Sequence, residues 1–105
     1  MAACPGMLRM VVGVAQFELF MPYNHSLKEK RHILGKLKDR VLAQLKVVVS
    51  EVGHQELWQR ASLGFAVVGG DERTLDSLIT RTMQAIVAMN LGEITREDRD
   101  MIHYE

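Results

Sequence analysis

Cysteine and proline are rare in this chain of 105 residues, which has one cysteine and two prolines. A single cysteine, Cys4, excludes an internal disulfide and suits a reducing cytoplasm. Cys4 stands just before Pro5 and Gly6 with no base close by in the sequence, so we interpret it as a bystander thiol. We expect residues 1–6 to form a frayed leader and residues 7–105 to form a single domain.

Long apolar runs and an excess of one charge are also missing. The apolar stretch from Met7 to Met21 is interrupted by Arg9, Gln16 and Glu18. It is too short to span a bilayer, and it lacks the basic start and cleavage site of a signal peptide. Thirteen Lys and Arg balance thirteen Asp and Glu, so the overall charge gives no sign of nucleic-acid or membrane binding. We therefore expect a cytoplasmic protein with no membrane partner.

The chain contains no recognisable catalytic or metal-binding motif. Gly69 and Gly70 form only a doublet, which a turn explains, rather than a phosphate-binding loop. We predict no enzymatic activity, no metal and no cofactor, with Lys30 and Glu51 as the only catalytic candidates. The four histidines lack metal-ligand spacing and are interpreted as surface residues: His25, His32, His54 and His103.

The charges that are present are unevenly distributed. Six Lys and Arg face two acids between Lys28 and Arg40, whereas five acids face two Arg between Glu93 and Glu105. A basic helix and an acidic tail can attract one another or a partner.

The stretch from Lys46 to Val68 is expected to form the centre of the fold. Two β-branched apolar runs flank a polar segment that carries Trp58, the only tryptophan. This pattern predicts two strands joined by a loop from about Gly53 to Glu56.

A further strand is predicted from Met10 to Phe20, where side chains alternate between two faces and Pro22 ends the pairing. One face of the strand carries Gly13, Ala15, Phe17 and Leu19, and the other carries Val12, Val14, Gln16 and Glu18.

The first helix is predicted to begin at Ser26, which forms a capping box with Glu29. Lys30 falls within the apolar sector of this helix, where a lysine either snorkels past the sheet or meets a specific partner; we favour snorkelling. The apolar stripe comprises Leu27, Ile33, Leu34, Leu37, Val41 and Leu45.

The second helix is predicted to begin after a cap at Asp71 and to end at Asn90 and Gly92. The segment that follows is either a polar edge strand anchored by Ile94 and Ile102 or a frayed tail. The buried stripe of the helix comprises Leu75, Leu78, Ile79, Thr82, Ile86 and Met89.

The order strand, helix, strand, strand, helix, strand predicts an α+β, ferredoxin-like βαββαβ fold. Right-handed crossovers give a four-stranded antiparallel sheet with two helices on one face.

Two segments also resemble a known family. SLKEKR at Ser26–Arg31 and SEVGHQELWQRASLGFAVV at Ser50–Val68 closely resemble the YlxP-like bacterial proteins, which are of unknown function, and VVGVAQFEL in the first strand fits as well. The resemblance runs from about Met10 to the end of the second helix and implies a ferredoxin-like fold in a cytoplasmic bacterial protein. Members are often encoded beside genes for translation initiation and ribosome maturation, which implies a role near ribosomal RNA or a ribosomal particle. No catalytic residues are established for the family, so none is carried over.

The RNA-recognition motif shares the ferredoxin-like fold and stacks bases on aromatic residues of its two central strands. Phe17 and Phe65 are expected to face the helices, which leaves the open face of the sheet without an aromatic platform. The open face is instead flat and largely apolar, so we expect a second copy to pack on it and form a homodimer. It is predicted to carry Val12, Val14, Gln16, Glu18, Ser62, Gly64, Ala66 and Val68.

Two binding surfaces are therefore candidates. We favour a non-enzymatic binding module for RNA, with phosphate contacts from the basic helix; a solvated helix face is the alternative interpretation of these cations. The other possibility is a structural protein that binds a protein through its sheet or through the segment near Trp58, whose strand parity with Arg60 predicts a place at the edge of the open face. A Trp that closes the end of the core is the alternative there. The nucleic-acid candidates are Lys28, Lys30, Arg31, Lys36, Lys38 and Arg60, and the partner-binding candidates are Gln55, Trp58, Gln59, Val12 and Val14.

Overall fold

Four strands and two helices make up the part of the chain that the computed structural model describes, residues 9–104. The predicted leader and Cys4 lie outside these residues. In chain order the elements are β1 (Met10–Phe20), α1 (Leu27–Leu45), β2 (Ser50–Gly53), β3 (Arg60–Gly69), α2 (Glu72–Ala88) and β4 (Glu93–Tyr104).

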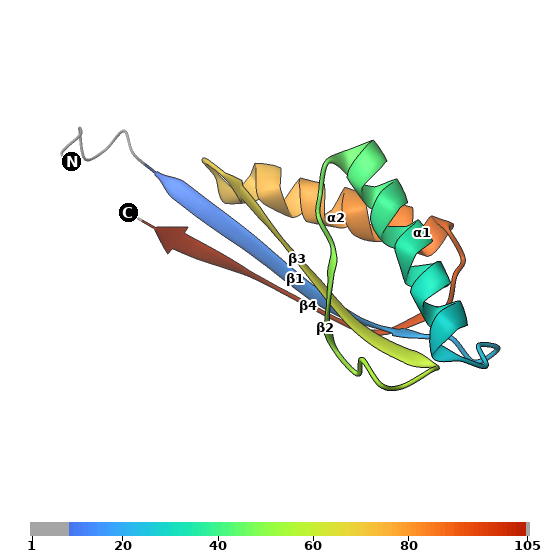
Figure 1. The fold of residues 1–105 in the computed structure, drawn as a ribbon. Helices are drawn as coiled ribbons and strands as arrows, with labels where there is room; N and C mark the ends of the chain where they lie inside the picture. The colour runs from blue at the N-terminus through green and yellow to red at the C-terminus, as the bar shows by residue number, and fades with distance from the viewer. Residues whose placement is uncertain (1–8, 105) are drawn as a thin grey trace.

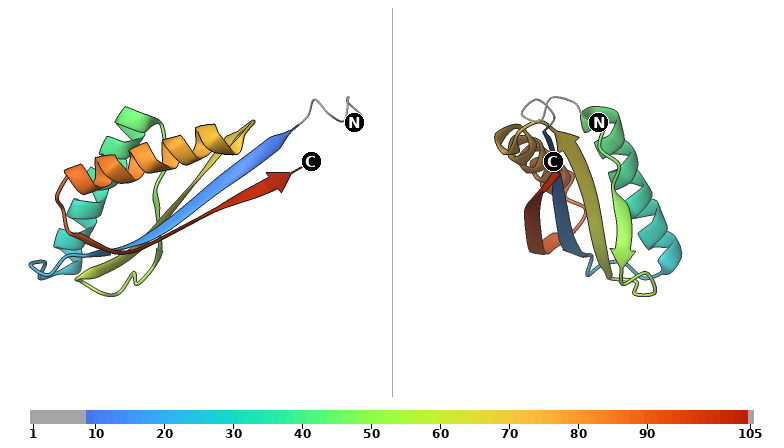
Figure 2. Two further views of the ribbon diagram at one scale, coloured as in Figure 1. Left: turned by 180° about the vertical axis from the view of Figure 1, so that it is seen from behind. Right: turned by 90° about the vertical axis from the view of Figure 1, so that its left-hand side faces the viewer.

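The strands form one antiparallel sheet in the order β2-β3-β1-β4, and both helices cover the same face (Figures 1 and 2). This is the ferredoxin-like arrangement, as predicted. The other face of the sheet has no covering element among the described residues and is called the open face below.

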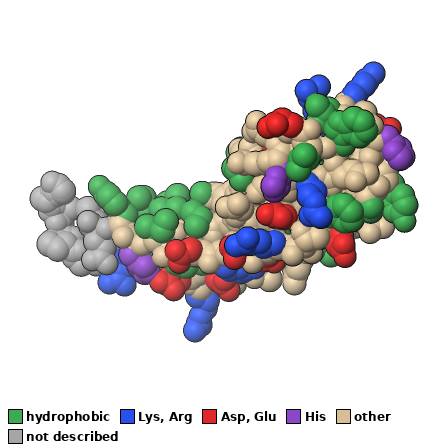
Figure 3. Space-filling model, turned by 90° about the horizontal axis from the view of Figure 1, so that it is seen from below, with side chains coloured by type: hydrophobic (Ala, Val, Ile, Leu, Met, Phe, Trp, Pro, Cys, Tyr) green, Lys and Arg blue, Asp and Glu red, His purple; other side chains and the backbone are tan. Residues whose placement is uncertain are grey.

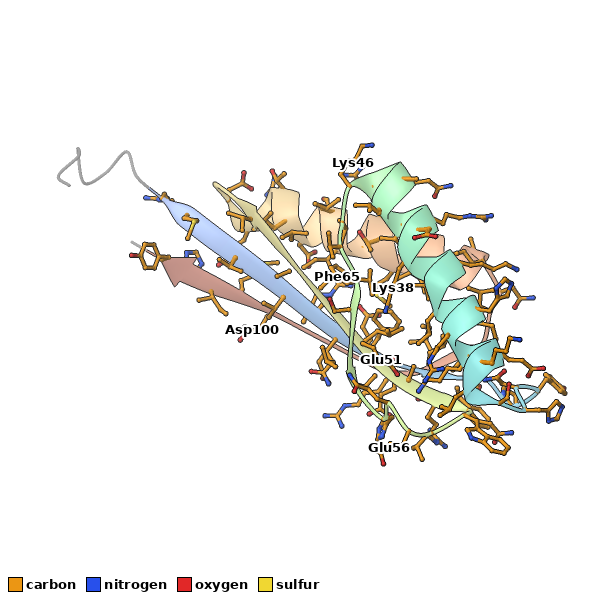
Figure 4. All side chains as sticks on the ribbon, in the orientation of Figure 1. Lys38, Lys46, Glu51, Glu56, Phe65 and Asp100 are labelled. Carbon is orange, nitrogen blue, oxygen red and sulfur yellow. The ribbon has the colours of Figure 1, made fainter. Side chains whose placement is uncertain are left out.

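Strand β1 lies at the centre of the sheet and pairs with β3 on one side and β4 on the other. Its predicted alternation is confirmed, because Ala15, Phe17 and Leu19 are buried under the helices and Gln16 is exposed on the open face. Phe65 of β3 is also buried on the helix side (Figure 4). The rings of Phe17 and Phe65 therefore belong to the core.

The two predicted helix caps are present. The Ser26 hydroxyl accepts a hydrogen bond from the Glu29 N–H at 3.0 Å, although the Glu29 carboxylate accepts from the N–H of His25 rather than from that of Ser26. Asp71 accepts from the N–H and from the hydroxyl of Thr74, each at 2.9 Å. These hydrogen bonds to the charged carboxylate lower the pKa of Asp71.

Strand β2 is shorter than predicted, and the connection that follows it is longer. Lys46 adopts a left-handed conformation (φ 59°) at the end of α1, and residues 47–49 follow without a ladder partner. Val47 and Val49 are nevertheless buried, which explains why their sequence resembles a strand. The turn between β2 and β3 covers residues 54–59 instead of the predicted Gly53 to Glu56.

The last segment is an edge strand and not a frayed tail, since β4 pairs with β1 along almost its whole length. A register shift opposite Glu18 and Leu19 marks an irregularity in this ladder. Arg99 ties the strand to α2 by donating hydrogen bonds to Asp76 and Thr80, each at 2.9 Å. Its ion pair with Glu97 is the main cause of its raised pKa.

Candidate functional site

Lys30 is buried against the strands and does not snorkel to the surface. Its side chain is 2 % exposed, and Nζ lies 2.8 Å from Oε2 of Glu51. Nζ also donates hydrogen bonds to the carbonyl oxygens of His54 (2.7 Å) and Leu57 (2.8 Å). Glu51 is opposite Leu63 in the β2–β3 ladder, so its side chain points to the helix side, as Figure 4 shows.

This arrangement corrects two expectations for Lys30. It has a specific partner, and it does not belong with the surface cations that were candidates for nucleic-acid contact, because a buried lysine with three oxygen partners cannot reach a phosphate. The catalytic candidates Lys30 and Glu51 do lie together, but as an ion pair that holds the β2–β3 turn against α1.

Helix α1 presents most of the other cationic candidates to the surface. Lys28, Arg31 and Lys36 are exposed, and within residues 9–104 no carboxylate lies within salt-bridge distance of them. Lys38 differs, since it is half-buried on the side of α1 that faces the strands (Figure 4). The exposed row, which we call the cationic face, consists of Lys28, Arg31, His32, Lys36 and Arg40.

Arg60 lies apart from the cationic face. It is the first residue of β3 and points to the open face, where its guanidinium lies 4.8 Å from the centre of the Phe20 ring. Phe20 was missing from the residues predicted for the open face. In the structure, the open face carries both Phe20 and Tyr104. Phe20 lies at the end of β1, whereas Tyr104 of edge strand β4 pairs with Met10 at the start of β1. The two rings therefore do not form the adjacent stacking positions of an RNA-recognition motif.

The turn after β2 is fixed mainly by side chains from other parts of the chain. Asn24 is buried and donates from Nδ2 to the carbonyl oxygen of Trp58, and Gln59 donates from Nε2 to the carbonyl oxygens of Pro22 and Asn24. Gln59 therefore has a structural role. Gln55 donates from the same turn to the carbonyl oxygen of Glu51 in β2.

Trp58 lies in this turn and outside β3, so strand parity does not position it. The residue is 53 % exposed, which excludes the alternative that it closes the end of the core. The valine candidates Val12 and Val14 lie further back along β1, roughly 26 Å and 20 Å respectively from the β1 end that contacts this turn, given a rise of about 3.3 Å per residue. The partner-binding candidates thus form two separate surfaces.

One of these surfaces is an apolar patch at the end of the open face where β1 begins. Figure 3 shows hydrophobic side chains gathered at the left-hand end of the sheet, with acidic and basic side chains beyond them. Val12 and Val14 are half-buried within this patch. Its exposed members are Met10 (38 %), Val68 (63 %), Ile102 (50 %) and Tyr104 (68 %). Val52 is also exposed on the open face, but it lies further along the sheet, beside Gly64.

The β1–α1 connection, the first turns of α1 and the α2–β4 connection come together at the other end of the molecule (Figure 1). The side chains of these segments line a groove of about 930 Å³. Its walls are mainly apolar, and Tyr23, which lines it, is 89 % exposed. Lys28 contributes an ammonium group and His32 an imidazole to the lining, and Glu29 and Glu93 contribute carboxylates. The remaining lining residues are Met21, Pro22, Asn24, Ile33, Asn90, Leu91 and Gly92.

Sequence reasoning missed this groove because its residues come from two parts of the chain that lie far apart in sequence, residues 21–33 and residues 90–93. The sequence contained only indirect signals of the groove. These are Pro22-Tyr23-Asn24, before the first predicted helix, and Asn90-Leu91-Gly92, at the end of the second. Gly92 is needed for close approach, since a Cβ at this position would lie 2.6 Å from the carbonyl oxygen of Phe20.

The histidines occupy surface positions, as predicted, and within residues 9–104 no group of three His, Cys, Asp or Glu side chains could hold a metal ion. His103 pairs with Glu72, and His54 Nε2 lies 3.9 Å from Oε2 of Glu18. No helix in the described part of the chain is long and apolar enough to cross a membrane.

Comparison with known sequences identifies relatives of unknown function. A family model described as "Protein of unknown function (DUF503)" matches residues 12–99. The uncharacterized protein YlxP of Bacillus subtilis (strain 168) is 34 % identical over 76 residues, which is 72 % of this chain and 83 % of that protein.

Comparison with solved structures finds weaker likenesses. The structural-genomics protein YJCS is 11 % identical with a TM-score of 0.49, covering 85 % of this chain and 96 % of that one. A dimeric protein of unknown function with a ferredoxin-like fold from Bacteroides fragilis NCTC 9343 is 15 % identical with a TM-score of 0.44, covering 91 % and 95 %. Likenesses at this level carry no functional information.

Proposed function

The chain belongs to the DUF503, or YlxP-like, family of proteins of unknown function, and we propose that it is a non-enzymatic module that binds RNA through the cationic face of α1. The observation that carries this proposal is the row of exposed cations on one helix without carboxylate partners among the described residues. Lys30, the cation that is paired, is turned away from this face.

Contacts of this kind are electrostatic and independent of sequence. Lysine and arginine side chains that neutralise phosphates release condensed counterions, so affinity falls as salt rises. For three phosphate contacts to a single strand the expected slope is about −2 in log–log terms, or roughly a 20-fold loss of affinity between 50 and 200 mM salt. The protein as a whole is neutral, so this response reports the local face rather than a bulk charge.

The test measures co-sedimentation with ribosomal subunits, and fluorescence anisotropy with a labelled RNA, at low and moderate salt. The variant Lys28→Glu/Arg31→Glu/Lys36→Glu is expected to abolish binding. The matched control is Arg73→Glu/Arg81→Glu/Arg96→Glu, which makes the same change in net charge on α2 and β4, at positions that are also exposed. Equal loss in both variants, or binding that is insensitive to salt, would contradict the proposal.

The apolar patch favours a second function, homodimerisation through the open face. Four exposed apolar residues gathered at one end of a sheet form a contiguous patch of the kind that marks an interaction site. Size-exclusion chromatography with light scattering at micromolar concentration is expected to give a dimer, and Val68→Asp is expected to give a monomer, whereas Val87→Asp on the exposed side of α2 is not. A monomeric wild-type protein would exclude this function.

A further inference from the structure

The groove at the β1–α1 end adjoins the cationic face. The chemical group that it binds can be inferred from its lining residues, and this inference rests on the proposed RNA binding. We propose that this groove accepts an unstacked base of a single-stranded RNA whose phosphates lie along α1. The inference deepens the proposed function, because it specifies a single strand and places one of its bases.

The first argument is continuity between the two surfaces. Lys28 and His32 line the groove and also belong to the cationic face. Lys36 follows at the same four-residue interval, and each interval rises about 6 Å along the helix. A strand that places successive phosphates along these three side chains passes directly over the mouth of the groove.

The second argument is the character of the walls. Apolar side chains such as Met21, Ile33 and Leu91 line a space of about 930 Å³, within the range of sites that enclose small organic groups. Tyr23 presents an almost fully exposed ring at the rim. A base has a flat apolar surface that stacks on such a ring, and single-stranded RNA is the form in which bases are free to do so.

The third argument is the arrangement of charge. Glu29 and Glu93 line the same groove, and carboxylates repel phosphate groups. They accept hydrogen bonds from the exocyclic amino groups of bases, as does the side-chain oxygen of Asn90. The phosphates are thus directed to the side of Lys28 and His32, and the neutral base is directed inward.

The test uses fluorescence anisotropy with three labelled RNAs of one length: a single strand, the same strand without bases, and a perfect duplex. The proteins are the wild type, Tyr23→Ala and a control, Val48→Ala, which removes an exposed apolar side chain outside the groove, the cationic face and the apolar patch. We expect the single strand to bind about tenfold more tightly than the abasic strand, and Tyr23→Ala to remove that difference while leaving binding of the abasic strand unchanged. Val48→Ala is expected to behave as the wild type.

The outcomes separate this inference from the function on which it rests. Equal binding of the intact and abasic strands, with loss of both in the Lys28→Glu/Arg31→Glu/Lys36→Glu variant, would overturn the base site and leave phosphate binding standing. Tighter binding of the duplex than of the single strand would also overturn it. If no RNA binds at any salt concentration, both the proposed function and the base site are wrong.

Discussion

Lys30 Nζ lies 2.8 Å from Glu51 Oε2, in a position where the lysine side chain is 2 % exposed and that of the glutamate 19 %. The same ammonium group binds the carbonyl oxygens of His54 and Leu57. One side chain of α1 therefore neutralises a carboxylate of β2 and fixes the path of the turn that leads to β3.

Replacement of Lys30 by methionine is expected to destabilise the protein by about 3 kcal/mol, because it leaves a largely buried carboxylate and two carbonyl oxygens without their cation. The free energy of unfolding from urea denaturation measures this loss. Lys28→Met is the matched control on the exposed face, with an expected change below about 0.5 kcal/mol. Adding Glu51→Gln to Lys30→Met should recover part of the loss, and an additive double variant would contradict the coupling.

Gly92→Ala is expected to destabilise the protein by about 1–3 kcal/mol, since its Cβ would lie 2.6 Å from the backbone oxygen of Phe20, which cannot rotate away. Gly35→Ala, in the middle of α1 with nothing within 4 Å of the new Cβ, is expected to stabilise by about 0.5–1 kcal/mol. Thermal or urea unfolding of the two variants measures whether each change lowers or raises the stability of the protein. A Gly92→Ala protein as stable as the wild type would show that the α2–β4 connection does not approach β1 so closely.

Asp71 predicts a dependence of stability on acid pH. Hydrogen bonds from Thr74 lower its pKa in the folded protein below the ordinary value of 3.8. The charged cap therefore contributes its full stabilisation above pH 3.8, and this contribution is lost as the pH falls through the lowered pKa. Asp71→Asn keeps a capping side chain but cannot ionise, so the difference in melting temperature between wild type and variant should shrink below pH 3.8. A difference that stays constant down to pH 2 would contradict this.

Asn24→Ala is expected to loosen the turn that carries Trp58, because it removes the Nδ2 donor from the Trp58 carbonyl oxygen. The expected cost is about 1–2 kcal/mol, typical of leaving a partly buried acceptor without its donor. Trp58 is the only tryptophan, so acrylamide quenching of its fluorescence should rise in the folded variant. Gln55→Ala, which removes a more exposed hydrogen bond of the same turn, serves as the control and should leave the quenching unchanged.

Much of the fold could be predicted from the sequence because local patterns and global topology agree. The alternation in β1 separated Phe17 from Gln16, and the residues at Ser26 and Asp71 marked the beginnings of both helices. Strand order then followed from the handedness of crossovers. The apolar runs around residues 47–49 misled the prediction of β2, since burial selects the same residue types whether or not the backbone joins a ladder.

For the candidate binding residues, too, local features could be predicted from the sequence and long-range contacts could not. Helical periodicity was sufficient to place Lys28, Arg31 and Lys36 on one exposed face, because the repeat of a helix is a local property. It also placed Lys30 in the apolar sector, but it could not supply the partner, which comes from a strand 21 positions further along the chain.

The sequence by itself determined the order of the elements, their caps, the buried stripes and the location of the cationic row, all of which depend on neighbours within a few residues. Only the tertiary structure decided that Lys30 meets Glu51, that Arg60 belongs to the opposite face from α1, and that two connections enclose a groove beside Lys28. The physical reason is that these features arise where segments distant in the chain come into contact, and such contacts leave no periodic pattern in any one segment.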